Sequence, residues 1–214
     1  MVFTSPIFLF FFLPVTYLGY RLLPGLRLGN TWLTAASLVF FSFGQLPYLV
    51  LLLFSVLLNY GFGLWLQSGT GRRRLAVGLA SAANLLLLGT FKYIDFLIGT
   101  VNGLTGVGLE LTGIVLPIGI SFYTFQGMSY VIDVYRHPEW GTRSLGKLLL
   151  YISFFPQLIA GPIVIYHDVS EQIDCRMLGP EETLYGLRRF ILGFGKKMLL
   201  ANPVGAVADQ VFAL

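Results

Sequence analysis

Residues 116–136, LPIGISFYTFQGMSYVIDVYR, are apolar enough to cross a membrane, yet they carry polar side chains at helical spacing. Gln126, Ser129 and Asp133 recur at intervals of three and four residues, which places them on one face of an α-helix. A polar face is costly to expose to lipid, so we expect it to face a protein interior or a water-filled path. Asp133 is interpreted mainly as a structural residue, in contact with water or with Arg136.

The next apolar stretch, YISFFPQLIAGPI at residues 151–163, repeats this pattern. Ser153 and Gln157 are four residues apart and would share one helical face. Pro156 lacks an amide hydrogen, so a kink is expected there, and Pro162 predicts a second break. Broken helices at membrane depth are tolerated where they are buried in protein or line a cavity.

These two polar faces together predict one shared cavity, lined by Gln126, Ser129, Ser153 and Gln157. For Gln126 and Ser129, the alternative is that they hold neighbouring helices together through hydrogen bonds. None of the four residues is assigned a catalytic role.

The strongest basic cluster is RRFILGFGKKMLL, residues 188–200. One interpretation is an interfacial helix whose cations contact lipid phosphates. The other is a site for an anionic donor, such as a phosphorylated or thioester cofactor, with Lys196 and Lys197 at its phosphates. No Walker, dinucleotide-binding, zinc-protease or nucleophile-elbow motif accompanies the cluster.

The remaining reactive side chains favour structural roles. Both histidines, His137 and His167, fall in loops beside predicted span ends, where solvated histidines are common. Lys92 and Asp95 are three residues apart and predict a local ion pair. The single cysteine, Cys175, cannot form a disulfide within the chain, and no metal-ligand spacing occurs, so no metal is expected.

Composition points to the lipid bilayer as the solvent of this chain. Of its 214 residues, 56% are hydrophobic, 15% aromatic and only 11% charged, with a mean hydropathy of +0.77. Soluble domains carry about 25% charged residues. The net charge of +4 is spread over short clusters between apolar stretches, as loop charges are in membrane proteins, which argues against nucleic-acid binding.

A membrane-crossing helix needs about 20 mostly apolar residues. We expect six spans and a final interfacial or re-entrant helix, with the first apolar stretch kept as an uncleaved span. The predicted spans are Ile7 to Leu23, Trp32 to Phe43, Leu46 to Leu66, Leu75 to Val101, Leu116 to Tyr135 and Leu148 to Tyr166, and the final helix is Leu184 to Leu214. The predicted fold is thus an all-α polytopic bundle forming a single membrane domain over residues 1–214.

Loop charges predict the orientation of these spans. Basic residues follow the first, third and fifth spans, whereas the loops after the second and fourth spans contain none. Because loops rich in Lys and Arg remain in the cytoplasm, the N-terminus is expected outside.

The two long motifs LPIGISFYTFQGMSYVIDVYR and YISFFPQLIAGPIVIYHDV, in that order, resemble the membrane-bound O-acyltransferase family, and within it the bacterial alginate O-acetyltransferases. NYGFGLWLQ, GTFKYIDFL and RRFILGFGKKMLLANPVGAVADQV support the resemblance, which covers essentially the whole chain.

This resemblance implies a multi-pass enzyme of the bacterial inner membrane, with helices arranged around a tunnel. An acyl thioester donor, acetyl-CoA or a carrier-bound acyl group, would arrive from the cytoplasm, and no cofactor would be tightly bound. The acceptor would be an extracytoplasmic polysaccharide or a partner protein of polysaccharide acetylation. Family members are about twice as long and carry their invariant histidine beyond the region matched here, near a tryptophan. Neither His137 nor His167 lies in that motif, so the chain is expected to be an N-terminal part, inactive alone without the C-terminal half.

Other functions remain open at this point. D-alanyl or other acyl transfer to cell-envelope polymers is the near alternative. Broken polar helices also occur in transporters, although no inverted repeat is visible here. A non-catalytic membrane subunit is the third possibility.

Overall fold

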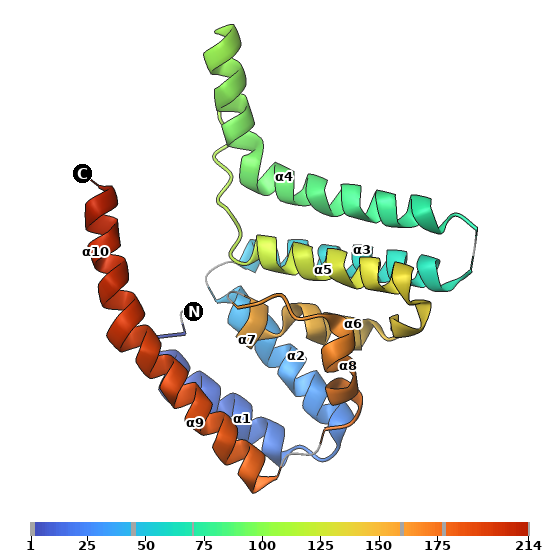
Figure 1. Cartoon of the computed structure of the whole chain (residues 1–214), viewed down its shortest axis with the longest axis vertical. Helices are drawn as coiled ribbons and strands as arrows, with labels where there is room; N and C mark the ends of the chain where they lie inside the picture. Colours follow the sequence, from blue (N-terminus) through green and yellow to red (C-terminus); the bar gives the residue numbers. More distant parts are fainter. Residues whose placement is uncertain (1–2, 44–45, 70, 159–160, 177–178, 214) are drawn as a thin grey trace. The chain divides into compact units, whose positions relative to one another are not determined.

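The computed structural model describes residues 3–43, 46–69, 71–158, 161–176 and 179–213, and all regular secondary structure within these ranges is helical (Figure 1). The chain divides into two compact units, Met1–Cys175 and Arg176–Leu214. The elements of the first unit are η1 (Phe8–Phe12), α1 (Leu13–Leu22), α2 (Leu26–Ser42), α3 (Leu46–Gln67), α4 (Arg73–Thr105), α5 (Ile120–Arg136), η2 (Pro138–Trp140), α6 (Leu145–Ser153), α7 (Phe155–Leu158) and α8 (Tyr166–Asp174). Those of the second are α9 (Pro180–Lys196), η3 (Lys197–Ala201) and α10 (Asn202–Phe212). The all-α prediction is confirmed for the described residues.

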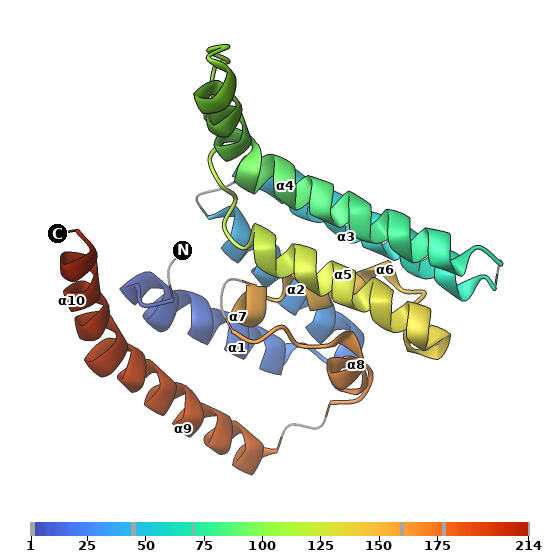
Figure 2. The same ribbon diagram turned by 45° about the horizontal axis from the view of Figure 1, so that its top comes forward.

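Helices α3, α4 and α5 pack on one another and form the largest layer of the first unit, seen side by side in both ribbon views (Figures 1 and 2). Tyr48, near the start of α3, donates its hydroxyl to the carbonyl of Val115, just before α5, at 2.6 Å. At the other end, Arg73 at the start of α4 donates to the last carbonyls of α5. Therefore α3 and α5 run parallel, and α4 runs antiparallel to both.

A buried pair of asparagines joins α3 to α4. Asn59 and Asn84 exchange side-chain hydrogen bonds of 3.1 and 2.9 Å, and each amide also donates to a carbonyl one turn earlier in its own helix. All four amide hydrogens of the pair are thereby used, as burial of such groups requires. Gly127 of α5 lies against this pair, since a Cβ added there would be 2.3 Å from the amide nitrogen of Asn59.

Gly119 starts α5 in the left-handed region, at φ 77°. A Cβ at this position would also lie 2.8 Å from the carbonyl oxygen of Leu158. Glycine is the residue that meets both demands without strain, because it has no Cβ. The glycine of the LPIG sequence thus lets the turn before α5 approach the end of α7.

A second, separate core forms where η1, α2 and α7 meet. Phe8, Phe12, Phe40 and Phe155 are buried and make ring contacts with centroids 5.3 to 6.1 Å apart. Such aromatic contacts add to the free energy of burial beyond the buried area alone. The cluster fixes the short helix α7 to the N-terminal helices.

The sixth predicted span is not one kinked helix. Helix α6 ends at Ser153, α7 covers only Phe155–Leu158, and residues 161–165 are not helical before α8 begins. The chain leaves the helix at Phe154, before the expected kink at Pro156, because Pro156 has no amide hydrogen to donate to the carbonyl of Ile152 and its ring would clash with that carbonyl. The amide of Phe155, exposed by the break, donates to the hydroxyl of Ser37 in α2 at 3.2 Å. The assumption that Ser153 and Gln157 share one helical face is therefore wrong.

Two helices are long and apolar enough to cross a membrane, α3 and α4. Together, η1 and α1 form a shorter apolar helix, Phe8–Leu22, and α2 and α5 have 17 residues each. The described residues thus contain a helix near each of the first five predicted spans. The count of six full crossings is not confirmed.

In the second unit, α9, η3 and α10 follow one another as a continuous helical segment from Pro180 to Phe212. Within it, Arg189 donates to the hydroxyl of Tyr185 at 2.9 Å, and the rings of Phe190 and Phe194 stack. This agrees with the helix expected over Leu184 to Leu214. The prediction of a single domain over residues 1–214 stays a prediction.

Candidate functional site

Five buried side-chain oxygens in α3, α5 and α6 have no hydrogen-bond partner among the described residues. They are Ser55 Oγ, Tyr123 OH, Thr124 Oγ1, Gln126 Oε1 and Ser153 Oγ. A buried polar atom without a partner costs roughly 1–3 kcal/mol of stability. The three helices that carry these oxygens pack on one another. A polar ligand, water or a further protein segment in this region could supply the missing hydrogen-bond partners.

Two of the four predicted cavity-lining residues lie in this region. Gln126 and Ser153 are almost completely buried, with relative exposures of 1% and 0%. Ser129 is partly buried and donates to Asp133 one turn later, at 3.3 Å. Gln157 is half-buried and donates to the carbonyl of Tyr151 at 2.5 Å. The Ser129 bond lies within α5, whereas the Gln157 bond joins α7 to the end of α6.

None of the three cavities described below is lined by Gln126, Ser129, Ser153 or Gln157. The four residues come from α5, α6 and α7, and the break between α6 and α7 separates the last two. Their role as the wall of a tunnel stays a prediction.

The largest described cavity, about 790 Å³, lies between α2 and α6. One turn after another, α2 presents Arg27, Asn30, Thr31 and Thr34 to it, and the start of α6 contributes Lys147. Thr31 and Thr34 donate to carbonyls of their own helix, at 2.9 and 2.8 Å, so their oxygens can accept hydrogen bonds from a ligand. Leucines and an alanine also line the cavity, which therefore suits a ligand with both a polar and an apolar part.

A second cavity of about 540 Å³ shares Arg27, Asn30 and Lys147 with the first. Lys147 forms an ion pair with Asp174 at the end of α8, and Asn30 donates to the carbonyl of Ile173 at 2.8 Å. The sequence analysis did not identify the groove that these two cavities form along Arg27, Asn30 and Lys147. The spacing of the polar residues in α2 did indicate a polar helical face, since Arg27, Asn30, Thr31 and Thr34 follow one side of the helix.

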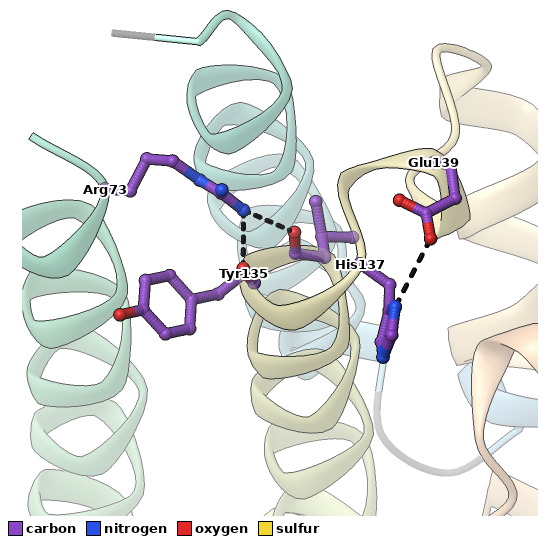
Figure 3. A network of polar contacts seen from close by, with 5 residues as sticks. Arg73, Tyr135, His137 and Glu139 are labelled. Carbon is purple, nitrogen blue, oxygen red and sulfur yellow. Dashed lines mark hydrogen bonds and ion pairs between the residues drawn. The ribbon is translucent and has the colours of Figure 1, made fainter. Parts of the chain in front are cut away.

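The two histidines, expected as separate solvated residues, lie on opposite faces of one tryptophan. The rings of His137 and Trp140 are 4.1 Å apart, as are those of Trp140 and His167, and both pairs are stacked. His137 Nδ1 also contacts a carboxylate oxygen of Glu139 at 3.2 Å (Figure 3). The stack ties the connection after α5 to the start of α8, and no sequence signal pointed to it.

The predicted ion pair of Lys92 with Asp95 is wrong. Asp95 accepts hydrogen bonds from the amide and hydroxyl of Thr112 and from the amide of Gly113, at 2.7, 2.6 and 3.2 Å. Lys92 instead lies over the ring of Tyr93. The segment after α4 folds back on the helix and supplies three donors that side-chain spacing within the helix cannot reveal.

Lys196 and Lys197 are exposed and lie where α9 continues into η3. No hydrogen bond or ion pair of their side chains is found among the described residues of the second unit. Their predicted contact with donor or lipid phosphates stays a prediction.

Comparison with known proteins supports the resemblance seen in the motifs. The chain is 40% identical to the probable alginate O-acetylase AlgI of Pseudomonas aeruginosa and 39% identical to that of Pseudomonas syringae pv. tomato, in both cases over 100% of this chain. It is 33% identical to the peptidoglycan O-acetyltransferase of Helicobacter pylori over 99% of its length. The chain spans less than half of each relative, 42%, 42% and 46% respectively. No family model and no solved structure matches it.

Proposed function

We propose that this chain, which is related along its length to alginate O-acetylases, forms part of a membrane O-acetyltransferase that acts on an extracytoplasmic polysaccharide. The observation that carries the proposal is identity of about 40% over the whole chain to two such enzymes. In this proposal the chain corresponds to less than half of a complete enzyme, and the remaining part supplies the catalytic histidine.

The distribution of side chains supports a location in the bacterial inner membrane. Large apolar residues of α3 and α4 are exposed, among them Val50, Leu86 and Phe96 at 70% or more. The amides of Asn59 and Asn84 are buried instead. Apolar side chains outside and satisfied polar groups inside are typical of membrane helices.

Helix lengths constrain how the chain crosses the bilayer. The 33 residues of α4 extend roughly 50 Å at 1.5 Å per residue, whereas the hydrocarbon core is only about 30 Å thick. One end of α4 must therefore reach beyond the core, or the helix must tilt or bend, and both ribbon views show that α4 changes direction along its length (Figures 1 and 2). We propose about six crossings, with the shorter helices completed by neighbouring non-helical residues, and an interfacial or re-entrant second unit.

The ends of the helices support the proposed orientation in the membrane. Arg73 at the start of α4 contacts the end of α5, so the basic loops after the third and fifth predicted spans lie at the same end of the layer. This agrees with the alternation of loop charges and supports a cytoplasmic position for that end, with the N-terminus outside.

In this part of the enzyme, polar residues would position substrates rather than break bonds. A histidine base outside this chain would activate the acceptor hydroxyl for attack on an acyl thioester. Gln126 and Ser153, whose buried oxygens have no partner among the described residues, would contact the reacting groups along the tunnel, together with Ser129 and Gln157. Lys196 and Lys197 would contact phosphates of the donor or of lipids, and acetylation partner proteins would receive the acetyl group outside.

A second acceptor is supported by one relative. The Helicobacter pylori protein is named a peptidoglycan O-acetyltransferase. The chain could thus serve acetylation of a cell-wall glycan instead of an alginate-like polymer.

The proposal is tested by reconstituting the complete enzyme that contains this chain in membrane vesicles with acetyl donor and either polymer. We expect base-labile acetate on the polymer, and none above background from this chain alone. Replacing Gln126→Leu or Gln157→Leu should lower turnover about tenfold, roughly 1.4 kcal/mol of lost transition-state stabilisation. Gln210→Leu, at an exposed position of α10, is the matched control.

Turnover by the isolated chain would overturn the assignment as a part of a larger enzyme. Normal turnover in both glutamine variants, at normal expression, would show that Gln126 and Gln157 do not line the substrate tunnel. Solute transport by the complete protein without acyl transfer would favour a transporter instead.

A further inference from the structure

A cavity of about 680 Å³ at one end of the α3–α4–α5 layer is lined by four arginines, Arg72, Arg73, Arg74 and Arg136, together with Tyr135. We propose that this cavity is a specific binding site for a phosphate group. The inference does not depend on acetyl transfer, since it rests only on the geometry and charge of this end of the layer.

No anionic side chain among the described residues pairs with the arginines of the cavity. Within the described parts of the chain the ion pairs join His137 to Glu139 and Lys147 to Asp174, and none involves a cavity arginine. The described residues that line the cavity include no carboxylate either. Guanidinium groups gathered without an anion repel one another, and a bound anion would relieve that repulsion.

Arg73 forms the fixed part of the site. Its guanidinium donates to the carbonyls of Val134 and Tyr135, at 3.3 and 2.5 Å, and lies 5.5 Å from the centre of the Tyr135 ring (Figure 3). Its Nε is buried and has no hydrogen-bond partner among the described residues. Arg73 thus joins α4 to α5 and holds the neighbouring arginines beside the end of α5.

The other three arginines are available to a ligand. Arg72, Arg74 and Arg136 are exposed, and no hydrogen bond or ion pair of their side chains is found in the described structure. They come from two segments more than 60 residues apart that the Arg73 contacts bring together. Several guanidiniums approaching from two sides fit the multiple oxygens of a phosphate better than the two oxygens of a carboxylate.

The position of the cavity favours a lipid headgroup as the source of the phosphate. It lies where the apolar helices α3 and α4 meet, between Gln67 and Arg73, at the depth where headgroups border a membrane-spanning helix. The cavity is also larger than a phosphate needs, which leaves room for the glycerol of an anionic phospholipid. A soluble phosphate is the other source, and the experiment separates the two.

The test compares the full chain, purified in a neutral detergent, with a triple variant, Arg72→Gln, Arg74→Gln and Arg136→Gln. Arg73 is left in place because it holds α4 against α5. A control variant, Lys92→Gln, Arg143→Gln and Arg188→Gln, removes the same charge elsewhere. Binding of phosphatidylglycerol, phosphatidylcholine and inorganic phosphate is measured for each, by native mass spectrometry for the lipids and by calorimetry for phosphate. Thermal unfolding without ligand checks that all three proteins are folded.

We expect the wild type and the control to bind phosphatidylglycerol at least tenfold more tightly than phosphatidylcholine, and the triple variant to lose this preference. If the wild type binds inorganic phosphate, the triple variant does not, and phosphatidylglycerol binding is unaffected by the three arginines, the phosphate site exists and its ligand is a soluble phosphate. If the triple variant and the control variant lose the preference for phosphatidylglycerol equally, binding depends only on total charge, and the proposal is overturned. Absence of selective binding in the wild type would overturn it as well.

Discussion

At the scale of residues, buried polar groups separate into those that the fold satisfies and those that it does not. The Asn59–Asn84 pair uses all of its amide hydrogens within the protein. Ser55, one turn before Asn59 in the same helix, has a buried hydroxyl whose oxygen is without a partner among the described residues. Burial alone therefore does not distinguish a structural polar residue from one that is free to bind a ligand. The hydrogen-bond partners of the side chain make that distinction.

Because the Asn59–Asn84 pair is hydrogen-bonded and the Ser55 hydroxyl is not, substitutions at these positions should lower the stability of the protein by different amounts. Asn59→Leu should destabilise the protein by about 2 kcal/mol, because it leaves the amide of Asn84 buried without its partner. The double variant Asn59→Leu, Asn84→Leu should be more stable than the sum of the single variants indicates, because no unpaired amide remains. Thermal unfolding in detergent measures these differences.

Ser55→Ala is the matched control, and it should change stability by less than about 0.5 kcal/mol because no hydrogen bond is lost. Additive effects of the two asparagine substitutions would contradict the coupling that the structure shows.

At the scale of elements, helical glycines differ in whether a neighbouring helix packs against them. Gly127 of α5 faces the amide of Asn59, whereas a Cβ added at Gly89 of α4 would meet no atom within 4 Å. The two glycines are both helical, so substitution by alanine has the same intrinsic effect on helix formation in each. The difference between them therefore reports the packing alone.

We expect Gly127→Ala to destabilise the protein by about 1–2 kcal/mol, because Asn59 must move and lose its hydrogen bonds. Gly89→Ala should instead stabilise it by up to about 1 kcal/mol, through the higher helix propensity of alanine. Chemical or thermal unfolding of both variants is the measurement. Equal effects at the two positions would show that the helices do not pack as described.

The break between α6 and α7 is another element-scale feature. Prolines predict that a helix is interrupted, but not where the freed amide finds an acceptor. Here Ser37 of α2 accepts from Phe155, 118 residues away in the sequence. The sixth predicted span consequently becomes two short helices and a non-helical segment instead of one kinked helix.

At the scale of the whole first unit, basic residues gather at one end of the α3–α4–α5 layer, and the segment after α4 lies at the other. This arrangement predicts opposite accessibility of the two ends in an inner membrane. In a Cys175→Ser background, Glu110→Cys should react with a membrane-impermeant maleimide added to intact spheroplasts. Gly71→Cys, where a Cβ meets no neighbour, should react only after permeabilisation.

Labelling of both positions from the same side would contradict the proposed topology. Cys175 must be removed first because it is an exposed free thiol. The Cys175→Ser protein without a new cysteine is the control and should remain unlabelled.

The sequence by itself determined the helical class, the apolar segments and the relationship to O-acetylases. Hydropathy and helical periodicity are local properties of the chain, and the two long motifs are contiguous, so none of these needs a three-dimensional arrangement. The same reasoning expected the polar side chains of Gln126 and Ser153 to face away from lipid, and both lie buried in α5 and α6.

Only the tertiary structure decided which polar groups meet. It showed the groove of Arg27, Asn30 and Lys147, the stacking of both histidines on Trp140, and the arginine cavity between the start of α4 and the end of α5. Each of these sites joins residues from different segments of the chain. Their proximity depends on how whole helices pack, and helical spacing within one segment carries no information about its neighbours.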